Sequence, residues 1–253
     1  MLHCGGYTDL GKTRPINEDG YYLSEYNKEL DALYVMVADG MGGHQAGEIA
    51  STMAVQQVSE VINKNFTAGM DVPEVKELLV RAVKSANHVI FEQGRENEER
   101  RGMGTTLTLC FVLGNKAIVA HVGDSRAYLL RQDAWHQITS DHSLVQELLR
   151  NGQITEEEAI HHPQKNVITR ALGTDFGVEI DIYEFTIYEG DILLLCTDGL
   201  SNMLSDERLK ELIKQNYGCS LDRLSEQLVT AANEEGGYDN ITAVLLAKES
   251  ELY

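Results

Sequence analysis

The sequence predicts an α+β fold with a largely antiparallel sheet. Strand-like apolar segments follow one another across short turns in the middle of the chain, and helix-like segments come in consecutive pairs on either side. A doubly wound fold would instead alternate single strands with single helices. With 253 residues and no linker rich in Pro, Gly or Ser, the chain is expected to form one domain over residues 1–253.

The first third of the chain predicts two strands followed by two helices. Strands are expected at residues 20–24 and 33–38, and the Gly-rich stretch 39–43 ends the second strand. Apolar residues spaced three and four apart predict a helix over residues 46–62. A second helix is expected to begin after Asp71, because Asp can cap a helix and Pro73 suits its first turn.

The middle and the end of the chain continue this pattern. Gly114 and Asn115 form a tight-turn dipeptide that predicts a hairpin between two strands. Strands are expected at residues 105–113, 116–122, 126–131, 135–138, 178–187, 191–196 and 240–246, and helices at 144–150, 206–215 and 221–233. Between residues 141 and 174 the strand pattern lapses, so this polar segment is either a substrate-selecting surface flap or an ordinary loop.

Composition excludes several classes of partner. There are 40 acidic and 21 basic residues, and the resulting charge of -19 disfavours binding to nucleic acid and to anionic membrane surfaces. No apolar run approaches the length of a membrane span, and the N-terminus lacks a signal-peptide pattern. The four cysteines form no CxxC pair and are interpreted as reduced thiols. A cytoplasmic protein is therefore expected, with a monomer as the default.

Four aspartates each follow a strand-like segment and stand beside a small or polar turn residue. They are Asp39 before Gly40, Asp124 before Ser125, Asp198 before Gly199, and Asp239 before Asn240. Each one alone favours a simple turn. Together they predict a cluster of carboxylates at strand ends, where a glycine lets the backbone approach a ligand.

A cluster of this kind is suited to hard divalent cations. Mg²⁺ and Mn²⁺ prefer carboxylate, carbonyl and water oxygens, and crowded carboxylates need cations to offset their repulsion. Two such ions can direct a bridging hydroxide at phosphorus, so the sequence indicates phosphate-ester hydrolysis. Arg14 supplies a guanidinium that can clamp phosphate, and Glu18 and Asp19 add two more acids. Taken alone, Arg14 and Glu18 would be interpreted as a surface ion pair.

Six groups of residues form motifs along the chain. In chain order they are Thr8-Asp9 with Gly11, Arg14 and Asn17-Glu18-Asp19; Val37-Ala38-Asp39-Gly40-Met41-Gly42-Gly43-His44; Gly102-Met103-Gly104-Thr105-Thr106; His121-Val122-Gly123-Asp124-Ser125-Arg126; Cys196-Thr197-Asp198-Gly199-Leu200; and Asp239-Asn240-Ile241-Thr242. These motifs resemble those of the metal-dependent protein phosphatase (PPM) family, in its bacterial type 2C serine/threonine branch, and they span nearly the whole chain in the family's order.

This resemblance implies a β-sandwich with paired helices on each outer face, and a Mn²⁺ or Mg²⁺ pair at one end. By resemblance, Asp39 bridges the two ions and Gly40 offers its carbonyl. The other implied metal ligands are Asp198 and Asp239 for the first ion and Glu18 for the second, with Asp19 as a close neighbour, and Asp124 with Asp198 for a third ion found in similar bacterial enzymes. Arg14 matches the phosphate-binding arginine, and the attack is direct, without a phosphoenzyme.

One position departs from the family pattern. Relatives from higher organisms place a histidine directly after the Asp-Gly pair and assign it as the acid for the leaving group, whereas this chain has Met41. His44 and a water on the metal are equal candidates for that role, and His44 is equally well explained as a helix-cap or packing residue. His161 and His162 are interpreted as flap histidines, and the glycine-containing segment 102–106 as a packing element.

The sequence therefore predicts an enzyme that removes phosphate from Ser and Thr of phosphoproteins, with a partner Ser/Thr kinase implied among its substrates by the resemblance. Two alternatives stay open at this point. One is a phosphatase of small phosphoesters, and the other is a catalytically silent binding module on the same fold.

Overall fold

Strand β3 (Ala32–Met41) shows why the fold has layers. Successive side chains of a strand point to opposite faces, so Val35 and Val37 join one apolar cluster while Met36 and Ala38 join another. The first cluster lies between two sheets, and the second lies beneath helices. Because both faces of the strand are apolar and buried, its sheet needs a covering layer on each side.

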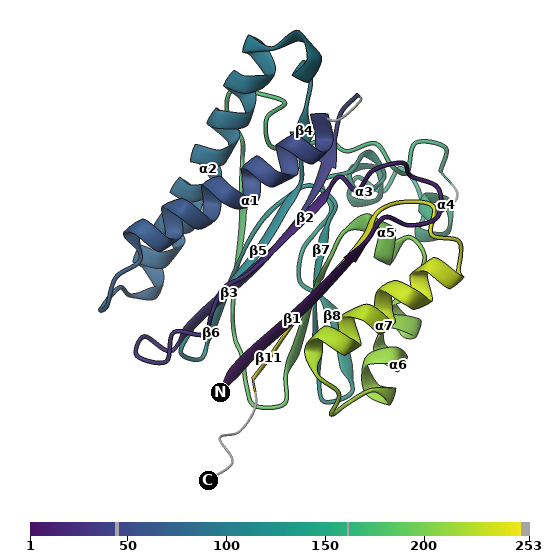
Figure 1. Ribbon diagram of the computed structural model, residues 1–253. Coiled ribbons are helices and arrows are strands. Elements are labelled where there is room, and N and C mark those ends of the chain that lie inside the picture. The colour runs from purple at the N-terminus through teal and green to yellow at the C-terminus, as the bar shows by residue number, and fades with distance from the viewer. Residues whose placement is uncertain (44–45, 161, 249–253) are drawn as a thin grey trace.

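Two antiparallel sheets provide the centre of the computed structural model, which describes residues 1–43, 46–160 and 162–248 (Figure 1). One sheet has the order β1-β11-β10-β7-β8, and the other has the order β2-β3-β5-β6-β9, with β4 paired to β3. The strands of the first sheet are β1 (Leu2–Asp9), β7 (Arg126–Arg131), β8 (Ala134–Gln137), β10 (Ile192–Cys196) and β11 (Ile241–Lys248). The others are β2 (Asp19–Leu23), β4 (Gly104–Thr105), β5 (Leu107–Leu113), β6 (Lys116–Val122) and β9 (Asp181–Thr186).

A pair of helices covers each outer face. Helices α1 (Ala46–Asn65) and α2 (Val72–Glu96) pack on the sheet that contains β3, and α6 (Asp206–Gln215) and α7 (Leu221–Glu234) pack on the other sheet (Figure 1). The short helices are η1 (Glu98–Arg100), α3 (Leu144–Arg150), α4 (Glu156–Ile160) and α5 (Asp198–Ser201). This arrangement confirms the α+β fold class and the αββα layering implied by the resemblance.

Local signals in the sequence placed many elements correctly. Asp71 caps α2, accepting from the amide of Glu74 while the Glu74 carboxylate accepts from the amide of Asp71. Gly114 adopts a φ of 60° in the turn of the β5–β6 hairpin, a conformation that glycine adopts at little cost. Helices α3 and α6 have the expected bounds.

Strand β1 was not predicted from the sequence. Its two glycines and scarce branched residues do not look like a strand, yet β1 pairs with β11 over eight residues. Gly5 is required there, because a side chain on it would run into the backbone of Leu221 and Asp222 at the start of α7. Tertiary pairing therefore overrides local propensity in β1.

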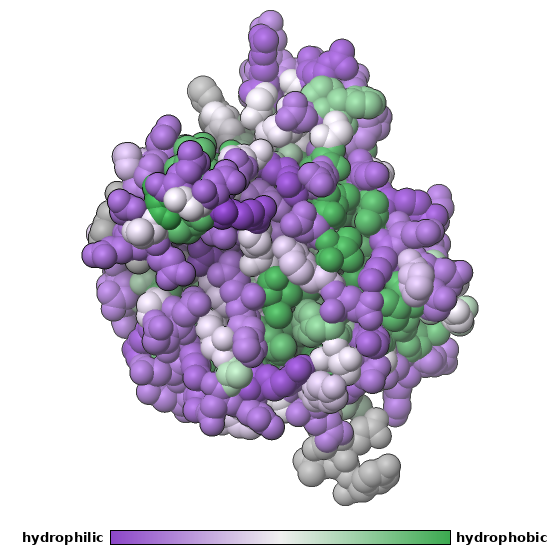
Figure 2. All heavy atoms as spheres, turned by 180° about the vertical axis from the view of Figure 1, so that it is seen from behind, coloured by the Kyte–Doolittle hydropathy of each residue, from purple (hydrophilic) through white to green (hydrophobic). Residues whose placement is uncertain are grey.

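The surface and the cysteines agree with the composition. The face in Figure 2 is mainly hydrophilic, with apolar patches among the polar side chains. All four cysteines are free, and burial raises the pKa of Cys110 and of Cys196 to about 12. Within the described ranges, no helix has both the length and the hydropathy needed to cross a bilayer.

Candidate metal centre

The four turn aspartates and Asp19 converge at one end of the sandwich. Asp19, which begins β2, lies directly opposite Asp39 of β3 in the sheet register. Asp198 follows β10, Asp239 precedes β11 and Asp124 follows β6. Burial raises the pKa of Asp39 well above its ordinary value, and the charges of the other four add to that rise. The predicted convergence of these carboxylates is therefore found in the structure.

Asp19 joins the two sheets at this end. Its Oδ2 accepts hydrogen bonds from the hydroxyls of Thr197, at 2.8 Å, and Thr242, at 2.6 Å. Thr197 directly follows β10 and Thr242 lies in β11, so both belong to the other sheet. The Thr242 hydroxyl also lies 2.7 Å from that of Thr8. These threonines were quoted as motif residues but given no task, and the structure shows that they orient Asp19.

Two hydroxyl residues of the segment 102–106 hold the backbone of Asp39. The amide of Asp39 donates to Thr106 Oγ1 at 2.9 Å, and Thr105 Oγ1 donates to the carbonyl of Asp39 at 2.9 Å. Both threonines are fully buried. The segment was predicted to be a packing element only, and its role in holding the Asp39 backbone was missed. Two adjacent hydroxyl residues directly before a buried strand are a signal that could have suggested this role.

Glu18 lies against the beginning of α1. Burial raises the pKa of Glu18 while the nearby amide of Gly47 lowers it, and a side chain at position 47 would collide with the Glu18 carboxylate. A negative charge is favourable at this end of a helix. The amide of Glu18 donates to Asn240 Oδ1 at 2.8 Å, and the Gly40 amide donates to the Glu18 carbonyl at 3.1 Å. Glu18 and Gly40 are thus held side by side, as expected for parts of one site.

Arg14 pairs with one of the clustered acids. Its Nη2 lies 2.8 Å from Asp239 Oδ2, and its side chain is 45% exposed. The charges of Glu18 and Asp39 also act on the guanidinium. Arg14 therefore stands at the open edge of the cluster, where a phosphate group could reach it.

Burial, together with mutual repulsion, raises the pKa values of several carboxylates in this cluster. Burial raises the pKa of Asp19 to about 7 against the opposing hydrogen bonds of Thr242 and Thr197, and Asp198 and Asp239 raise it further. Burial and the charge of Asp198 raise the pKa of Asp124 to about 8. Burial is also the largest cause of the raised pKa of Asp198.

These shifts predict how the stability of the metal-free protein depends on pH. The folded pKa values of Asp19 and Asp124, about 7 and 8, lie above the ordinary value of about 3.9 in an unfolded chain. Their contribution is fully present below the unfolded value and is lost as the pH rises through 7 and 8. In chelator, the melting temperature is expected to fall by roughly 5 °C or more between about pH 6 and about pH 9.

Differential scanning calorimetry measures this effect, with Asp124→Asn as the matched variant. Because that variant lacks one of the titrating groups, its melting temperature should fall less over the same range. A wild-type melting temperature that rises with pH in chelator would contradict the electrostatic description of the site.

Four carboxylate oxygens in this cluster are buried and accept no hydrogen bond. They are Oε1 of Glu18 and Oδ1 of Asp19, Asp124 and Asp198. Buried acceptors normally have partners, and divalent cations prefer such oxygens, so these residues fit the implied Mn²⁺ or Mg²⁺. Among the described residues, no group of three His, Cys, Asp or Glu side chains is arranged to hold one ion in this structure.

Of the three histidines named from the sequence, His44 and His161 lie outside the described residues. His162 is partly buried, and its Nδ1 accepts from the amide of Gln164 at 3.2 Å, in a local turn of the 141–174 segment.

Comparison with known proteins identifies the family. The sequence profile described as Protein phosphatase 2C matches residues 15–248. The chain belongs to this family. The type 2C resemblance seen in the motifs is thereby confirmed, and the protein is an enzyme, a protein phosphatase.

Relatives of this phosphatase align along nearly its whole length. The serine/threonine phosphatase stp of Listeria innocua is 40% identical over 247 residues, covering 98% of this chain and 96% of the relative. The protein phosphatase PhpP of Streptococcus pneumoniae is 42% identical over 244 residues, covering 96% of each. The solved catalytic domain of the phosphatase PstP, in complex with two manganese ions, is 34% identical with a TM-score of 0.84, covering 98% of this chain and 99% of that one.

Proposed function

We propose that this phosphatase hydrolyses phosphoserine and phosphothreonine in proteins at a centre of two Mn²⁺ or Mg²⁺ ions, and that residues 1–253 form a single phosphatase domain. The main support is the set of buried, unpartnered carboxylate oxygens around Asp39. The manganese pair bound by the related PstP domain supports two ions as the working number.

The proposed ligands follow from the cluster. Asp39, at its centre, would hold both ions, and Gly40 would contribute its carbonyl. Asp198 and Asp239 would hold the first ion and Glu18 the second, with Asp19 supporting them from its threonine-bound position. Asp124 and Asp198, whose charges interact, are the proposed holders of a third ion.

A pair of ions held by these residues would supply an activated water for direct attack at phosphorus, without a phosphoenzyme. Arg14 binds the phosphate of the substrate through its guanidinium, which exchanges its bond to Asp239 for phosphate oxygens. Thr105 and Thr106 keep the Asp39 backbone fixed, so that its carboxylate is in place before substrate arrives. For the leaving-group proton, His44 and water remain the two proposed donors.

Replacing Arg14 by Ala is expected to raise KM for a phosphothreonine peptide about 10- to 100-fold, the loss of a charged hydrogen bond of about 1.5–3 kcal/mol. The turnover number should change much less, because the nucleophile does not depend on Arg14. Steady-state kinetics separate the two effects. Arg14→Lys is the matched variant, because it keeps the positive charge but lacks the bidentate hydrogen-bonding geometry of the guanidinium. A selective loss of kcat at unchanged KM would contradict the phosphate-clamp role.

Cellular context is part of the proposal. A cytoplasmic location fits the four free cysteines. We propose that the protein acts as a monomer on phosphoproteins, including a partner Ser/Thr kinase, and that its charge of -19 keeps it from nucleic acid and anionic membranes.

Phosphate release from a phosphothreonine peptide, with manganese and with or without chelator, tests the proposed function. A small aryl phosphate assayed in parallel decides the substrate class. Faster metal-dependent turnover of the peptide supports a protein substrate. Equal turnover of both would favour the small-phosphoester alternative, and no metal-dependent release would overturn the proposal.

A further inference from the structure

We propose that His142 is a positioning residue that holds the turn carrying Asp124, and that Asp181 orients it for this task. The inference rests on the proposed function, since it acts through a proposed metal ligand. His142 is 6% exposed, stands near the start of the 141–174 segment and was assigned no role from the sequence.

Two hydrogen bonds join His142 to the residue before Asp124. The amide of His142 donates to the carbonyl of Gly123 at 2.7 Å, and the amide of Gly123 donates to His142 Nδ1 at 2.9 Å. Gly123 has a φ of 114°, and a side chain there would collide with Thr106, so the turn has little freedom of its own. Losing the ring would leave the buried Gly123 amide without a partner.

The other end of the same turn is held by the neighbouring residue. Arg126 and Asp141 form a bidentate pair, with Nη2 of Arg126 2.7 Å from Oδ2 of Asp141. The consecutive residues Asp141 and His142 therefore hydrogen-bond to the two ends of the turn 123–126, at Arg126 and Gly123. Asp124, between the two attachments, has one oxygen buried and unpartnered, facing no protein donor. The two attachments set the direction in which that carboxylate points.

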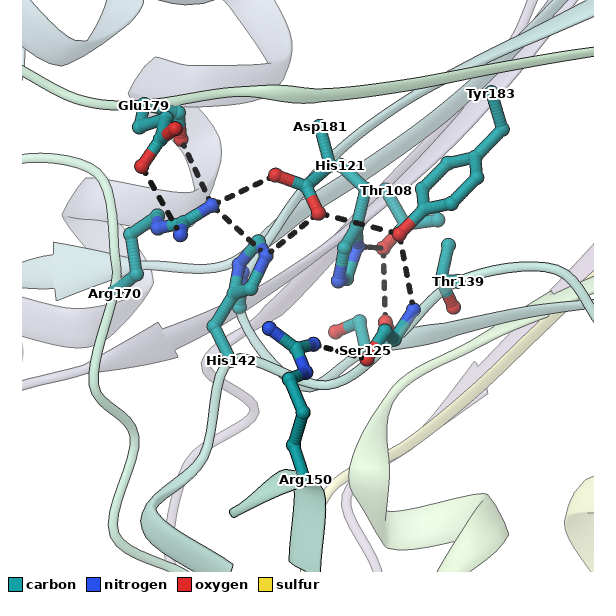
Figure 3. A network of polar contacts seen from close by, with 12 residues as sticks. Thr108, His121, Ser125, Thr139, His142, Arg150, Arg170, Glu179, Asp181 and Tyr183 are labelled. Carbon is teal, nitrogen blue, oxygen red and sulfur yellow. Dashed lines mark hydrogen bonds and ion pairs between the residues drawn. The ribbon is translucent and has the colours of Figure 1, made fainter. Parts of the chain in front are cut away.

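The ring's own orientation comes from Asp181. Because Nδ1 accepts from Gly123, the neutral ring carries its proton on Nε2, which lies 3.4 Å from Asp181 Oδ2, an oxygen that can accept it. Nη1 of Arg170 lies 3.0 Å from the same Nε2, but two donors cannot bond each other, so Arg170 instead donates to Asp181 Oδ1 at 2.9 Å. Figure 3 shows Asp181 between Arg170, His142 and the Tyr183 hydroxyl, which bonds the carboxylate at 3.2 Å.

This chain of contacts resembles the outer-sphere supports that commonly orient metal ligands. The removal of such supports typically costs 10- to 100-fold in metal affinity. His142 touches neither the substrate nor the proposed ions, so its effect is expected in metal affinity and in the exchange of the Gly123 amide rather than in phosphate binding.

The experiment compares His142→Ala, His142→Asn and the exposed control His136→Ala in the full chain. His142→Ala should weaken binding of the weakest-held Mn²⁺ about tenfold or more by calorimetry, and should speed hydrogen exchange of the Gly123 amide by a similar factor. An Asn carbonyl can replace Nδ1 as the acceptor, so His142→Asn should restore both values to within about threefold of wild type. KM for a phosphothreonine peptide at saturating manganese should stay near wild type in all three.

A second pair tests the role of Asp181 and covers the case in which His142→Ala does not fold. Asp181→Ala should weaken Mn²⁺ binding, whereas Asp181→Asn keeps an acceptor for Nε2 and should preserve it. The proposal is overturned if His142→Ala matches His136→Ala in both readouts, or if His142→Asn is as impaired as His142→Ala. A wild-type protein that binds no Mn²⁺ would instead overturn the proposed function, and Gly123 exchange would still decide the role of His142.

Discussion

Removing divalent metal with a chelator is expected to lower phosphopeptide hydrolysis at least about 1,000-fold, because the cations contribute several kcal/mol of transition-state stabilisation. Added Mn²⁺ should restore the rate, since the carboxylate cluster remains folded without it. The rate of phosphate release is measured before chelation, after chelation and after manganese is added back.

The control for chelation is circular dichroism of the same samples. An unchanged far-ultraviolet spectrum would show that activity is lost through the site and not through unfolding. Hydrolysis that continues at its original rate in excess chelator would contradict the role assigned to the cluster.

Replacing Asp39 by Asn is expected to reduce hydrolysis at least about 100-fold, because this residue is proposed to bridge both ions and thereby to position the nucleophile. Folding should be intact. The backbone bonds of Asp39 to Thr105 and Thr106 do not involve its carboxylate, and the change removes one of several charges that repel one another. In chelator the variant should therefore melt at or above the wild-type temperature.

The matched control is Asp175→Asn, which makes the same chemical change at an exposed position. It should leave both rate and stability near wild type. Near wild-type turnover by Asp39→Asn at low manganese would refute the bridging assignment.

Most of the fold could be predicted because its signals are local. The capping pair of Asp71 and Glu74 and the turn at Gly114 each depend on residues close in sequence. Strand β1 could not be predicted in this way, because its pairing with β11 and the close approach of α7 to Gly5 involve residues more than 200 positions away. Packing between distant segments decides such elements.

In the candidate site, too, the residues with a local sequence signal could be predicted and those placed by distant contacts could not. The acids were recognisable because each stands beside a turn residue at a strand end, and a shared motif order linked them. The groups that hold them were not recognisable. Thr197 and Thr242 reach Asp19 from the opposite sheet, and His142 reaches Gly123 from a segment without regular pattern. A single hydroxyl or imidazole carries no sign in the sequence of the distant group that it will contact.

The most direct test of the metal centre is anomalous scattering from crystals grown with Mn²⁺. We expect two strong manganese peaks bounded by Asp39, Asp198, Asp239 and Glu18, with the Asp39 carboxylate between them. Crystals with bound manganese elsewhere and these carboxylates pointing away from one another, with no peak among them, would contradict the account.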